Sequence, residues 1–427
     1  MPTKALGRAI LITGLLLITG VLTGKVDLVV LAVPFAVGVA FGLRRRPDER
    51  PRIALGADDG YLAEGDEADG AVTVGNPTAV PYDVVIVRAR TPRWIRVEKA
   101  DRPTVLTLPS QGVEELPLHG PALRWGRHRL GPAAAQAIAC DGLLASQPAV
   151  IGTCDVRVYP VTEPFDADEA MPRAAGLVGA HRSRRPGEGG ELAGVRVFAP
   201  GDRLRRVDWR VSLRARQLHV AATLSDRDAE VVLLLDVLAE AGRSGGIGGS
   251  ASVLDTTVRA AAAIAEHYLH RGDRVSLLEY GPNARRLRPA TGRRQYLTVL
   301  EWLLDVHATP TPYEPSEQLF GPHLLSSNAL VVVLTPLVDG RSAAMLARLA
   351  RAGRFVVAVD TLPADVTPSR QGTWTDVAYR LWRVERDNTI GQLREHGVPV
   401  VAWAGAGSLD LVLRDVARLA SAPKAML

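Results

Sequence analysis

The sequence contains only two cysteines in 427 residues, Cys140 and Cys154. Two thiols cannot form the disulfide framework of a small secreted protein, so that class is excluded. We interpret both as free thiols in a reducing compartment. The chain is too long for one ordinary domain, and we expect two or three.

Two enzyme motifs are also absent. The sequence has neither a glycine-rich phosphate loop that ends in lysine nor an H-E-x-x-H zinc helix. These absences favour a non-enzymatic protein that needs no cofactor. One alternative stays open, an enzyme with a cleft at its strand ends that uses a dinucleotide or a divalent metal.

Long apolar runs occur near the beginning of the chain. The segment Ala9–Leu43 has only two charged residues, Lys25 and Asp27, which divide it into two runs of about the length of a membrane-spanning helix. A cleaved signal peptide is the alternative, but no clear cleavage site follows and the second apolar run comes at once. The sequence therefore predicts a transmembrane helical hairpin over residues 1–46.

Basic residues flank this hairpin at both ends. Lys4 and Arg8 precede it and the run Arg44–Arg46 follows it, whereas the turn contains only Lys25. Cytoplasmic flanks carry the excess of lysine and arginine in membrane proteins. We expect a multi-pass protein of the plasma membrane with its soluble domains in the cytoplasm.

Short β-branched segments fill residues 52–165. Examples are "GAVTVGNPT", "YDVVIVRAR" and "CDVRVYP", which glycine, proline, asparagine and aspartate separate. This pattern predicts a β-sandwich-like domain, and nothing in it has catalytic spacing. Residues 166–229 are expected to be a connector that contains a helix and a strand, with a flexible tip at "HRSRRPGEGG", His181–Gly190.

Continuous apolar runs alternate with helical stretches over residues 230–427. "EVVLLLD", "ALVVVLTP" and "RFVVAVD" are buried-strand runs, and Val253–Arg271, Thr389–Gly397 and Ser408–Ala420 are among the helical stretches. Such alternation predicts a doubly wound α/β domain whose parallel sheet is covered on both faces.

Acidic residues follow or end several of these strand runs, and ligands bind beyond the carboxyl ends of strands in such sheets. The acids are Asp236, Glu279, Asp339 and Asp360.

This layout resembles a von Willebrand factor A domain. The resemblance implies a divalent cation bound by a D-x-S-x-S loop after the first strand. Here the loop is "DVLAE", in which Asp236 keeps the first place while Leu238 and Glu240 replace the two serines. Leucine offers no oxygen to a hard cation. We predict a degenerate site without metal, and Asp236 and Glu240 are the candidates for a remodelled one.

A glycine-rich loop follows the first of these strands. Gly246, Gly248 and Ala251 fit the dinucleotide pattern G-x-G-x-x-A. In dinucleotide-binding folds the glycines turn the chain directly at the strand end, but here "VLAEAGRS" intervenes. We interpret the segment as a flexible loop.

Arginines and aspartates are dense in "GDRLRRVDWR". Leu204, Val207 and Val211 recur at helical spacing and Asp202 can cap the first turn, which predicts a short helix with Trp209 partly buried. The interleaved aspartates favour an ion-pair network that joins the two soluble domains. A nucleic-acid surface is the alternative, but we expect no nucleic-acid partner.

The residues around this helix resemble the family called domain of unknown function 58. The shared pattern is P-G-D, two arginines, an aliphatic residue, D-W-R, a small residue and an arginine. "WGRHRLGP" and "VYP" also resemble its upstream region, whereas "DVLAE" and "HVAATL" depart from it. The expected interaction residues are Gly201, Asp202, Arg205, Arg206, Asp208, Trp209, Arg210 and Arg214.

This resemblance implies a membrane-anchored protein with a von Willebrand A-like domain. The family is often encoded beside MoxR-type AAA+ ATPases, which implies an adaptor or scaffold for such an ATPase or for another protein partner.

Overall fold

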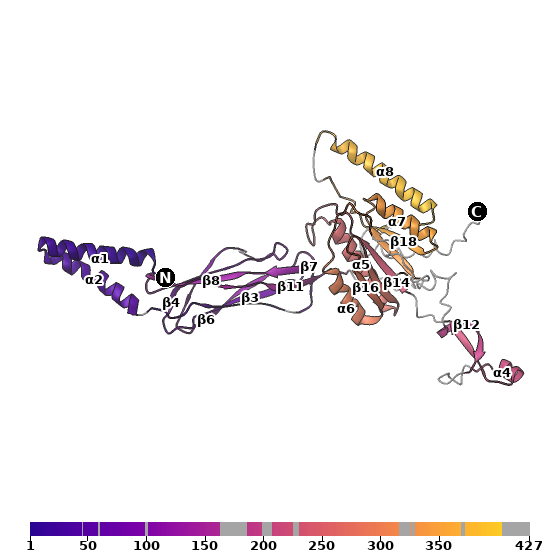
Figure 1. Cartoon of the computed structure of the whole chain (residues 1–427), viewed down its shortest axis with the longest axis horizontal. Coiled ribbons are helices and arrows are strands. Elements are labelled where there is room, and N and C mark those ends of the chain that lie inside the picture. The colour runs from indigo at the N-terminus through magenta and orange to yellow at the C-terminus, as the bar shows by residue number, and fades with distance from the viewer. Residues whose placement is uncertain are drawn as a thin grey trace. The chain divides into compact units, whose positions relative to one another are not determined.

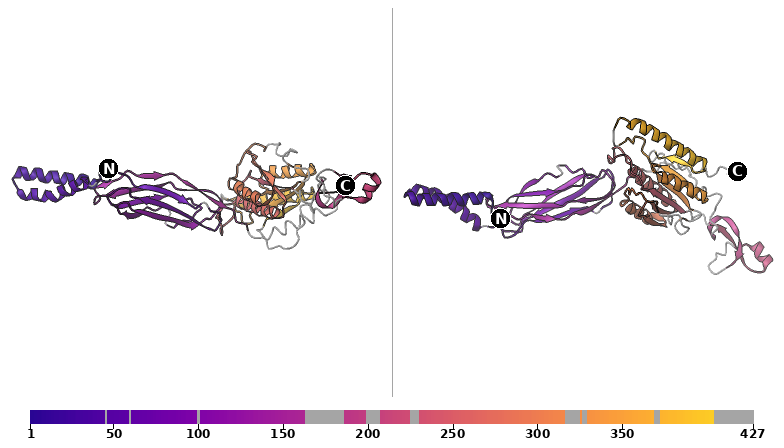
Figure 2. Two further views of the ribbon diagram at one scale, coloured as in Figure 1. Left: turned by 90° about the horizontal axis from the view of Figure 1, so that it is seen from below. Right: turned by 45° about the horizontal axis from the view of Figure 1, so that its top comes forward.

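The protein is a mixed α/β chain with two N-terminal apolar helices and several sheets (Figures 1 and 2). It forms two compact units, Met1–Tyr159 and Pro160–Leu427. The computed structural model describes residues 1–44, 46–58, 60–98, 101–162, 186–198, 207–224, 230–315, 325, 329–368 and 372–403.

Two apolar helices begin the first unit, α1 (Lys4–Thr23) and α2 (Val26–Arg44). The Thr3 hydroxyl oxygen accepts a hydrogen bond from the Leu6 N–H and caps α1. Both helices are long and apolar enough to cross a membrane, and only 11% of the most apolar window of each is buried. Their apolar surface is therefore not the core of this unit.

Three sheets make up the rest of the first unit. The first contains β1 (Arg52–Ala57), β3 (Glu67–Gly75) and β6 (Val113–Pro121). The second contains β10 (Ala149–Ile151), β8 (Ala133–Ala139), β4 (Tyr82–Ala89) and β5 (Thr104–Leu108), with β9 (Leu144–Ala145) paired to β8. The third contains β2 (Leu62–Ala63), β11 (Cys154–Tyr159) and β7 (Gly126–Leu130).

The first two sheets share a hydrophobic core. Val72 and Val74 of β3 pack in one cluster with Val85 of β4 and Ala135 of β8. Successive side chains of a strand point to opposite faces, so one face of each sheet is buried there. β8 is hard to recognise from the sequence, because "AAAQAIA" has a single β-branched residue, Ile138, no aromatic residue, and otherwise mostly alanine, which is depleted in strands.

A six-stranded sheet forms the centre of the second unit, in the order β16-β15-β14-β17-β18-β19. Its strands are β14 (Glu230–Asp236), β15 (Arg274–Tyr280), β16 (Arg286–Ala290), β17 (Leu330–Thr335), β18 (Phe355–Asp360) and β19 (Val400–Ala402). All pairings are parallel except that of β16 with β15. The prediction of a parallel sheet is therefore wrong at this edge, where "RLRPA" alternates between exposed and half-buried residues and has no apolar run.

Helices lie on both sides of this sheet (Figure 1). α5 (Val253–His270) packs with α6 (Gly292–Leu303), and α7 (Gly340–Arg351) packs with α8 (Thr375–Glu395). One core cluster joins Leu234 and Val333 of the strands to Met345 of α7 and Leu393 of α8. The predicted helix Thr389–Gly397 is only the end of α8, and the predicted helix Ser408–Ala420 lies outside the described residues.

A two-stranded sheet and a short helix precede the six-stranded sheet in sequence. β12 (Pro186–Val197) pairs antiparallel with β13 (His219–Leu224), and α4 (Trp209–Ala215) lies between them in the chain. The second half of the predicted flexible tip is thus part of β12, because it pairs with β13. The first half of the tip lies outside the described residues.

The order of the six strands reverses beside β14. The chain passes from β14 to β15 and β16 on one side, and then to β17 and β18 on the other. In open α/β sheets ligands bind at the carboxyl ends of the strands where the order reverses. The topology therefore predicts a ligand site at the carboxyl ends of β14 and β17.

Candidate functional site

Asp236 joins the carboxyl ends of β14 and β17. It ends β14 and is buried. Its Oδ2 accepts hydrogen bonds from the Thr335 hydroxyl at 2.7 Å and the Ser342 hydroxyl at 2.6 Å, and its Oδ1 accepts one from the Leu238 N–H at 3.1 Å. Burial raises the pKa of Asp236 despite these three donors. Both carboxylate oxygens already bind donors of the chain itself.

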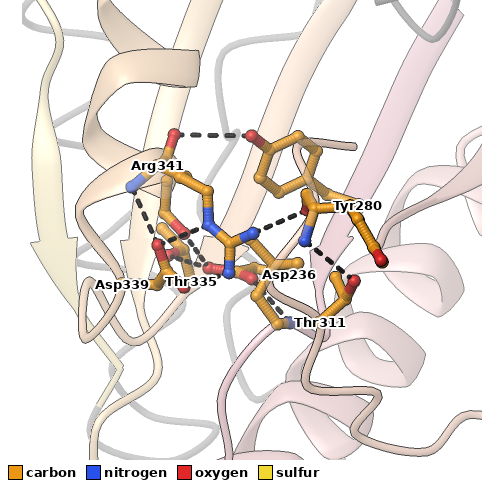
Figure 3. A network of polar contacts seen from close by, with 9 residues as sticks. Asp236, Tyr280, Thr311, Thr335, Asp339 and Arg341 are labelled. Atoms are coloured by element: carbon orange, nitrogen blue, oxygen red, sulfur yellow. Dashed lines mark hydrogen bonds and ion pairs between the residues drawn. The ribbon is translucent and has the colours of Figure 1, made fainter. Parts of the chain in front are cut away.

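An arginine–aspartate pair follows β17 (Figure 3). Asp339 caps α7. Arg341 donates from Nε to Asp339 Oδ1 at 2.9 Å, from Nη2 to Oδ2 at 2.6 Å, and from Nη1 to the Tyr313 carbonyl at 2.7 Å. These hydrogen bonds from Arg341 lower the pKa of Asp339. The pair fixes the start of α7 to the loop after α6.

A second ion pair lies at the end of β18. Asp360 accepts a hydrogen bond from Nη2 of Arg386, whose Nε donates to the Pro336 carbonyl at 3.0 Å. The side chains of Asp360 and Arg386 are 14% and 8% exposed. The pair therefore joins β18, the turn after β17, and α8 in a largely buried place.

The two predicted metal candidates have different partners. Glu240 Oε1 accepts a hydrogen bond from the Leu254 N–H at the start of α5, at 3.4 Å, whereas Asp236 binds groups of β17 and α7. The Leu238 N–H donates to Asp236, and a hydrogen-bond donor cannot serve as a ligand for a cation. Across the described ranges, no group of three or more His, Cys, Asp or Glu side chains is placed to hold a metal ion.

Amides at the start of α5 also have acceptors within the chain. Ser252 Oγ accepts from the Asp255 N–H, and Asp255 Oδ2 accepts from the Ser252 N–H, which is a capping box. The Val253 N–H donates to the Ala241 carbonyl at 3.0 Å. A pyrophosphate at a helix start binds such amides. This geometry gives no support to the dinucleotide alternative.

The glycine-rich loop between β14 and α5 contains Gly246 and Gly248 at φ 78° and 76°, a conformation that glycine adopts without strain. Its segment Gly242–Gly246 has the spacing G-x-S-x-G of a nucleophile elbow, with Ser244 at the serine place. That elbow requires a sharp turn directly from strand to helix. Ser244 lies inside the loop, and its Oγ accepts a hydrogen bond from the Gly246 N–H.

Glu279 is a buried acid on β15, paired in register with Leu235. In the part of the chain that the structure describes, neither carboxylate oxygen has a hydrogen bond. The nearest cation is Arg285, with Nη1 at 3.7 Å from Oε2, and this guanidinium donates to the carbonyls of Trp302 and Asp305. Burial raises the pKa of Glu279, which favours its neutral form.

Sequence reasoning found these acids but not their partners. Ser342 lies 106 residues after its partner Asp236, and Arg386 lies 26 residues after its partner Asp360, and no motif links either pair. One local signal was present: Asp339 directly precedes the predicted helix, as an N-cap does. That signal places the start of α7, and with it Ser342, near the end of the preceding strand.

α4 begins at Trp209 with Asp208 as its N-cap, whereas the predicted N-cap, Asp202, lies outside the described residues. Asp208 Oδ1 accepts hydrogen bonds from the N–H groups of Arg210 and Val211, at 3.0 and 3.1 Å. Val207 precedes the helix and forms a β-bridge with Val220, so the predicted helical face through Val207 is wrong. The spacing could not decide which aspartate caps the helix.

The prediction that Trp209 is partly buried is also wrong. Trp209 is 62% exposed, and Leu213, one turn later, is 78% exposed. The buried residue of α4 is Ser212, whose Oγ accepts a hydrogen bond from the His219 N–H at 2.8 Å. α4 thus contacts β13 through a small polar residue and leaves its two large apolar side chains in solvent.

The other signature residues divide into two groups. Arg210 and Arg214 lie exposed on α4. Gly201, Asp202, Arg205 and Arg206 lie outside the described residues, so the ion-pair network that includes them stays a prediction.

Parts of the chain are similar to several solved structures, and two of them serve as examples. The CARDB domain of the PF1109 protein from Pyrococcus furiosus, in complex with di-metal ions, is 16% identical and covers 26% of this chain and 90% of that domain, with a TM-score of 0.19. A FixG-related protein from Vibrio parahaemolyticus is 10% identical and covers 24% of this chain and 96% of its own, with a TM-score of 0.17.

Curated relatives are uncharacterized mycobacterial proteins, from Mycobacterium bovis and from two strains of Mycobacterium tuberculosis. Each is 33% identical over 137 residues, which is 31% of this chain. The chain covers 42% of the length of these relatives. Residues 194–366, which include α4, Asp236 and Asp339, match the family described as protein of unknown function DUF58.

Proposed function

We propose that this chain is a non-enzymatic protein-interaction protein, an adaptor or scaffold that works with a MoxR-type AAA+ ATPase. The observation that supports the proposal is the exposure of Trp209 and Leu213 on α4, within the segment that matches the family. Tryptophan is enriched among the residues that contribute most to protein interfaces. Arg210 and Arg214 lie exposed on the same helix and add charge around this apolar pair.

In this proposal the second unit is a doubly wound, von Willebrand A-like domain that docks a partner without a cation. The strand order, with β14 at the centre and a reversal between β14 and β17, supports such a fold. Asp236 has the place of the first metal ligand, but it accepts hydrogen bonds from Thr335, Ser342 and Leu238. A docking mechanism that needs no metal agrees with these bonds.

The proposal includes anchoring in the plasma membrane through α1 and α2. Both helices have the length and composition of a span, with Lys4 and Arg8 near the start of α1 and Arg44 at the end of α2. Since basic flanks stay in the cytoplasm, a reporter fused after Gly56 is expected to be active as a cytoplasmic fusion. Activity of a periplasmic reporter at that position would contradict this orientation, and a fusion at Gly24, in the turn between the helices, is the matched control.

Co-purification of the full chain with a co-expressed MoxR-type ATPase tests the adaptor role. We expect Trp209→Ala combined with Leu213→Ala to abolish co-purification. Because both side chains are exposed, each substitution should change the free energy of unfolding by no more than about 0.5 kcal/mol. The melting temperature of the double variant should therefore match that of the unmodified chain.

Val105→Ala combined with Val150→Ala is the matched control, since both valines are exposed apolar residues of the first unit. This control should co-purify with the ATPase as the unmodified chain does. Full retention of the ATPase by the Trp209 and Leu213 double variant would refute a docking role for α4. A large drop in its melting temperature would show that these side chains pack within the protein.

A further inference from the structure

An apolar stripe runs along the outer face of α8. Trp374, Val377, Leu381 and Val384 are 76%, 57%, 68% and 57% exposed. Trp374 is the N-cap residue of α8, and the other three follow within the helix. The intervals of three, four and three residues are those of a coiled-coil seam. Figure 1 shows α8 beside α7, at the outside of the second unit.

The opposite face of α8 already packs on its own unit. Arg386 and Leu393 are buried, and Ile390 packs against the core cluster of the sheet. At 3.6 residues per turn, these residues lie on the side of the helix opposite Leu381 and Val384. A surface helix needs one apolar face for its core. The stripe is a second apolar face, which takes no part in the core that the described residues of this unit form.

Charged residues beside the stripe match those of an identical helix. With Leu381 at heptad position a and Val384 at d, Arg380 takes position g and Glu385 position e. In a parallel pair of helices, a g residue lies beside the e residue five places later in the partner helix, and opposite charges there select the partner. Arg380 of each copy then meets Glu385 of the other, and both residues are exposed in the single chain.

The next a position belongs to Asn388, seven residues after Leu381 and also exposed. A single asparagine at an a position specifies the register of a coiled coil, because it can form a hydrogen bond with the same residue of its partner. Both the charges and this polar residue therefore complement a second copy in parallel orientation.

We propose that α8 pairs with α8 of a second copy of this chain as a short parallel coiled coil. Trp374, Leu381 and Asn388 occupy its a positions, and Val377 and Val384 occupy its d positions. The seam from Trp374 to Asn388 is about 21 Å long at 1.5 Å per residue. So short a seam gives a small interface, and small interfaces belong to weak or transient complexes.

Cysteine cross-linking of the full chain in cells tests the pairing and its orientation. In a parallel pair, Leu381→Cys and Asn388→Cys each lie opposite the same residue of the partner, so both should form disulfide-linked dimers after mild oxidation. Asp376→Cys, exposed on α8 but away from the seam, is the matched control and should stay at the background of the unmodified chain. Cross-linking at Leu381→Cys without cross-linking at Asn388→Cys would overturn the parallel pairing, and its absence at both would overturn pairing altogether.

Charge exchange tests the identity of the partner. Arg380→Glu and Glu385→Arg each place like charges across the seam, and each should weaken the homodimer about tenfold. The double variant restores opposite charges and should dimerise like the unmodified chain. The two single variants, expressed together with distinct tags, should pair with each other, because both contacts are then attractive. Equal dimerisation of all variants would overturn the proposal.

Discussion

Replacing Arg386 with methionine is expected to lower the free energy of unfolding by about 3–5 kcal/mol. The guanidinium is the partner of Asp360 and also donates to the Pro336 carbonyl. Methionine keeps most of the volume but leaves a largely buried carboxylate without its cation. Breaking a buried pair from one side is costly because the remaining charge stays out of water. Equilibrium denaturation of the full chain, followed by a probe in the second unit, measures the change.

Arg383→Met, at an exposed arginine of the same helix, is the matched control and should change the free energy of unfolding by no more than about 0.5 kcal/mol. The combination of Asp360→Asn with Arg386→Met removes the orphaned charge as well. It should therefore be more stable than Arg386→Met alone, which is the sign of a coupled pair in a double-mutant cycle. Equal losses for Arg386→Met and Arg383→Met would mean that the pair contributes no stability.

Much of the second unit could be predicted because its central strands are recognisable from the sequence alone. "EVVLLLD" and "ALVVVLTP" are continuous apolar runs, and only a strand covered on both faces needs them. β16 was not predicted because it lies at the edge and contains two arginines. The first half of α8 was missed for a related reason. Its apolar residues form two faces, one for the core and one outside, so no single helical stripe stands out.

The candidate site could be predicted only at the level of single residues. Asp236 ends a strand, and the topology of a doubly wound sheet implies that such an acid faces the edge where ligands bind. What the sequence does not encode locally is the set of donors around it. Thr335 and Ser342 reach Asp236 only because β17 lies beside β14 and α7 starts just beyond β17.

The exposure of Trp209 could not be predicted either, because its spacing from Leu213 is that of any amphipathic helix. Periodicity identifies an apolar face but not what covers it. On α4 the helix is held to β13 through Ser212 and His219. α4 has only seven residues, and the face that contacts β13 is the one that carries Ser212.

Asp236→Ala is the second substitution with a large expected effect. It removes the acceptor of three donors, the hydroxyls of Thr335 and Ser342 and the N–H of Leu238. Each buried donor left without an acceptor costs about 1–3 kcal/mol, so we expect a total loss of about 3–5 kcal/mol in the free energy of unfolding, since the hydroxyls can turn toward other acceptors. Ser342→Ala removes one donor and leaves the carboxylate two others, so its cost should be much smaller. A cost for Asp236→Ala no larger than that of Ser342→Ala would contradict the bridging role.

The pH dependence of stability distinguishes the effect of the charge of Asp236 from the effect of its shape. Because burial raises its pKa in the folded state, the unfolded chain loses this proton at a lower pH than the folded chain. The stability contributed by protonated Asp236 is thus fully present below the ordinary pKa of aspartate and falls as the pH rises through the raised value. Asp236→Asn keeps the shape but cannot ionise. The free energy of unfolding of the unmodified chain, minus that of Asp236→Asn, should therefore decrease with rising pH above about 4. A difference independent of pH would mean that the three hydrogen bonds balance the cost of burial, and that Asp236 is as acidic in the folded protein as in the unfolded chain.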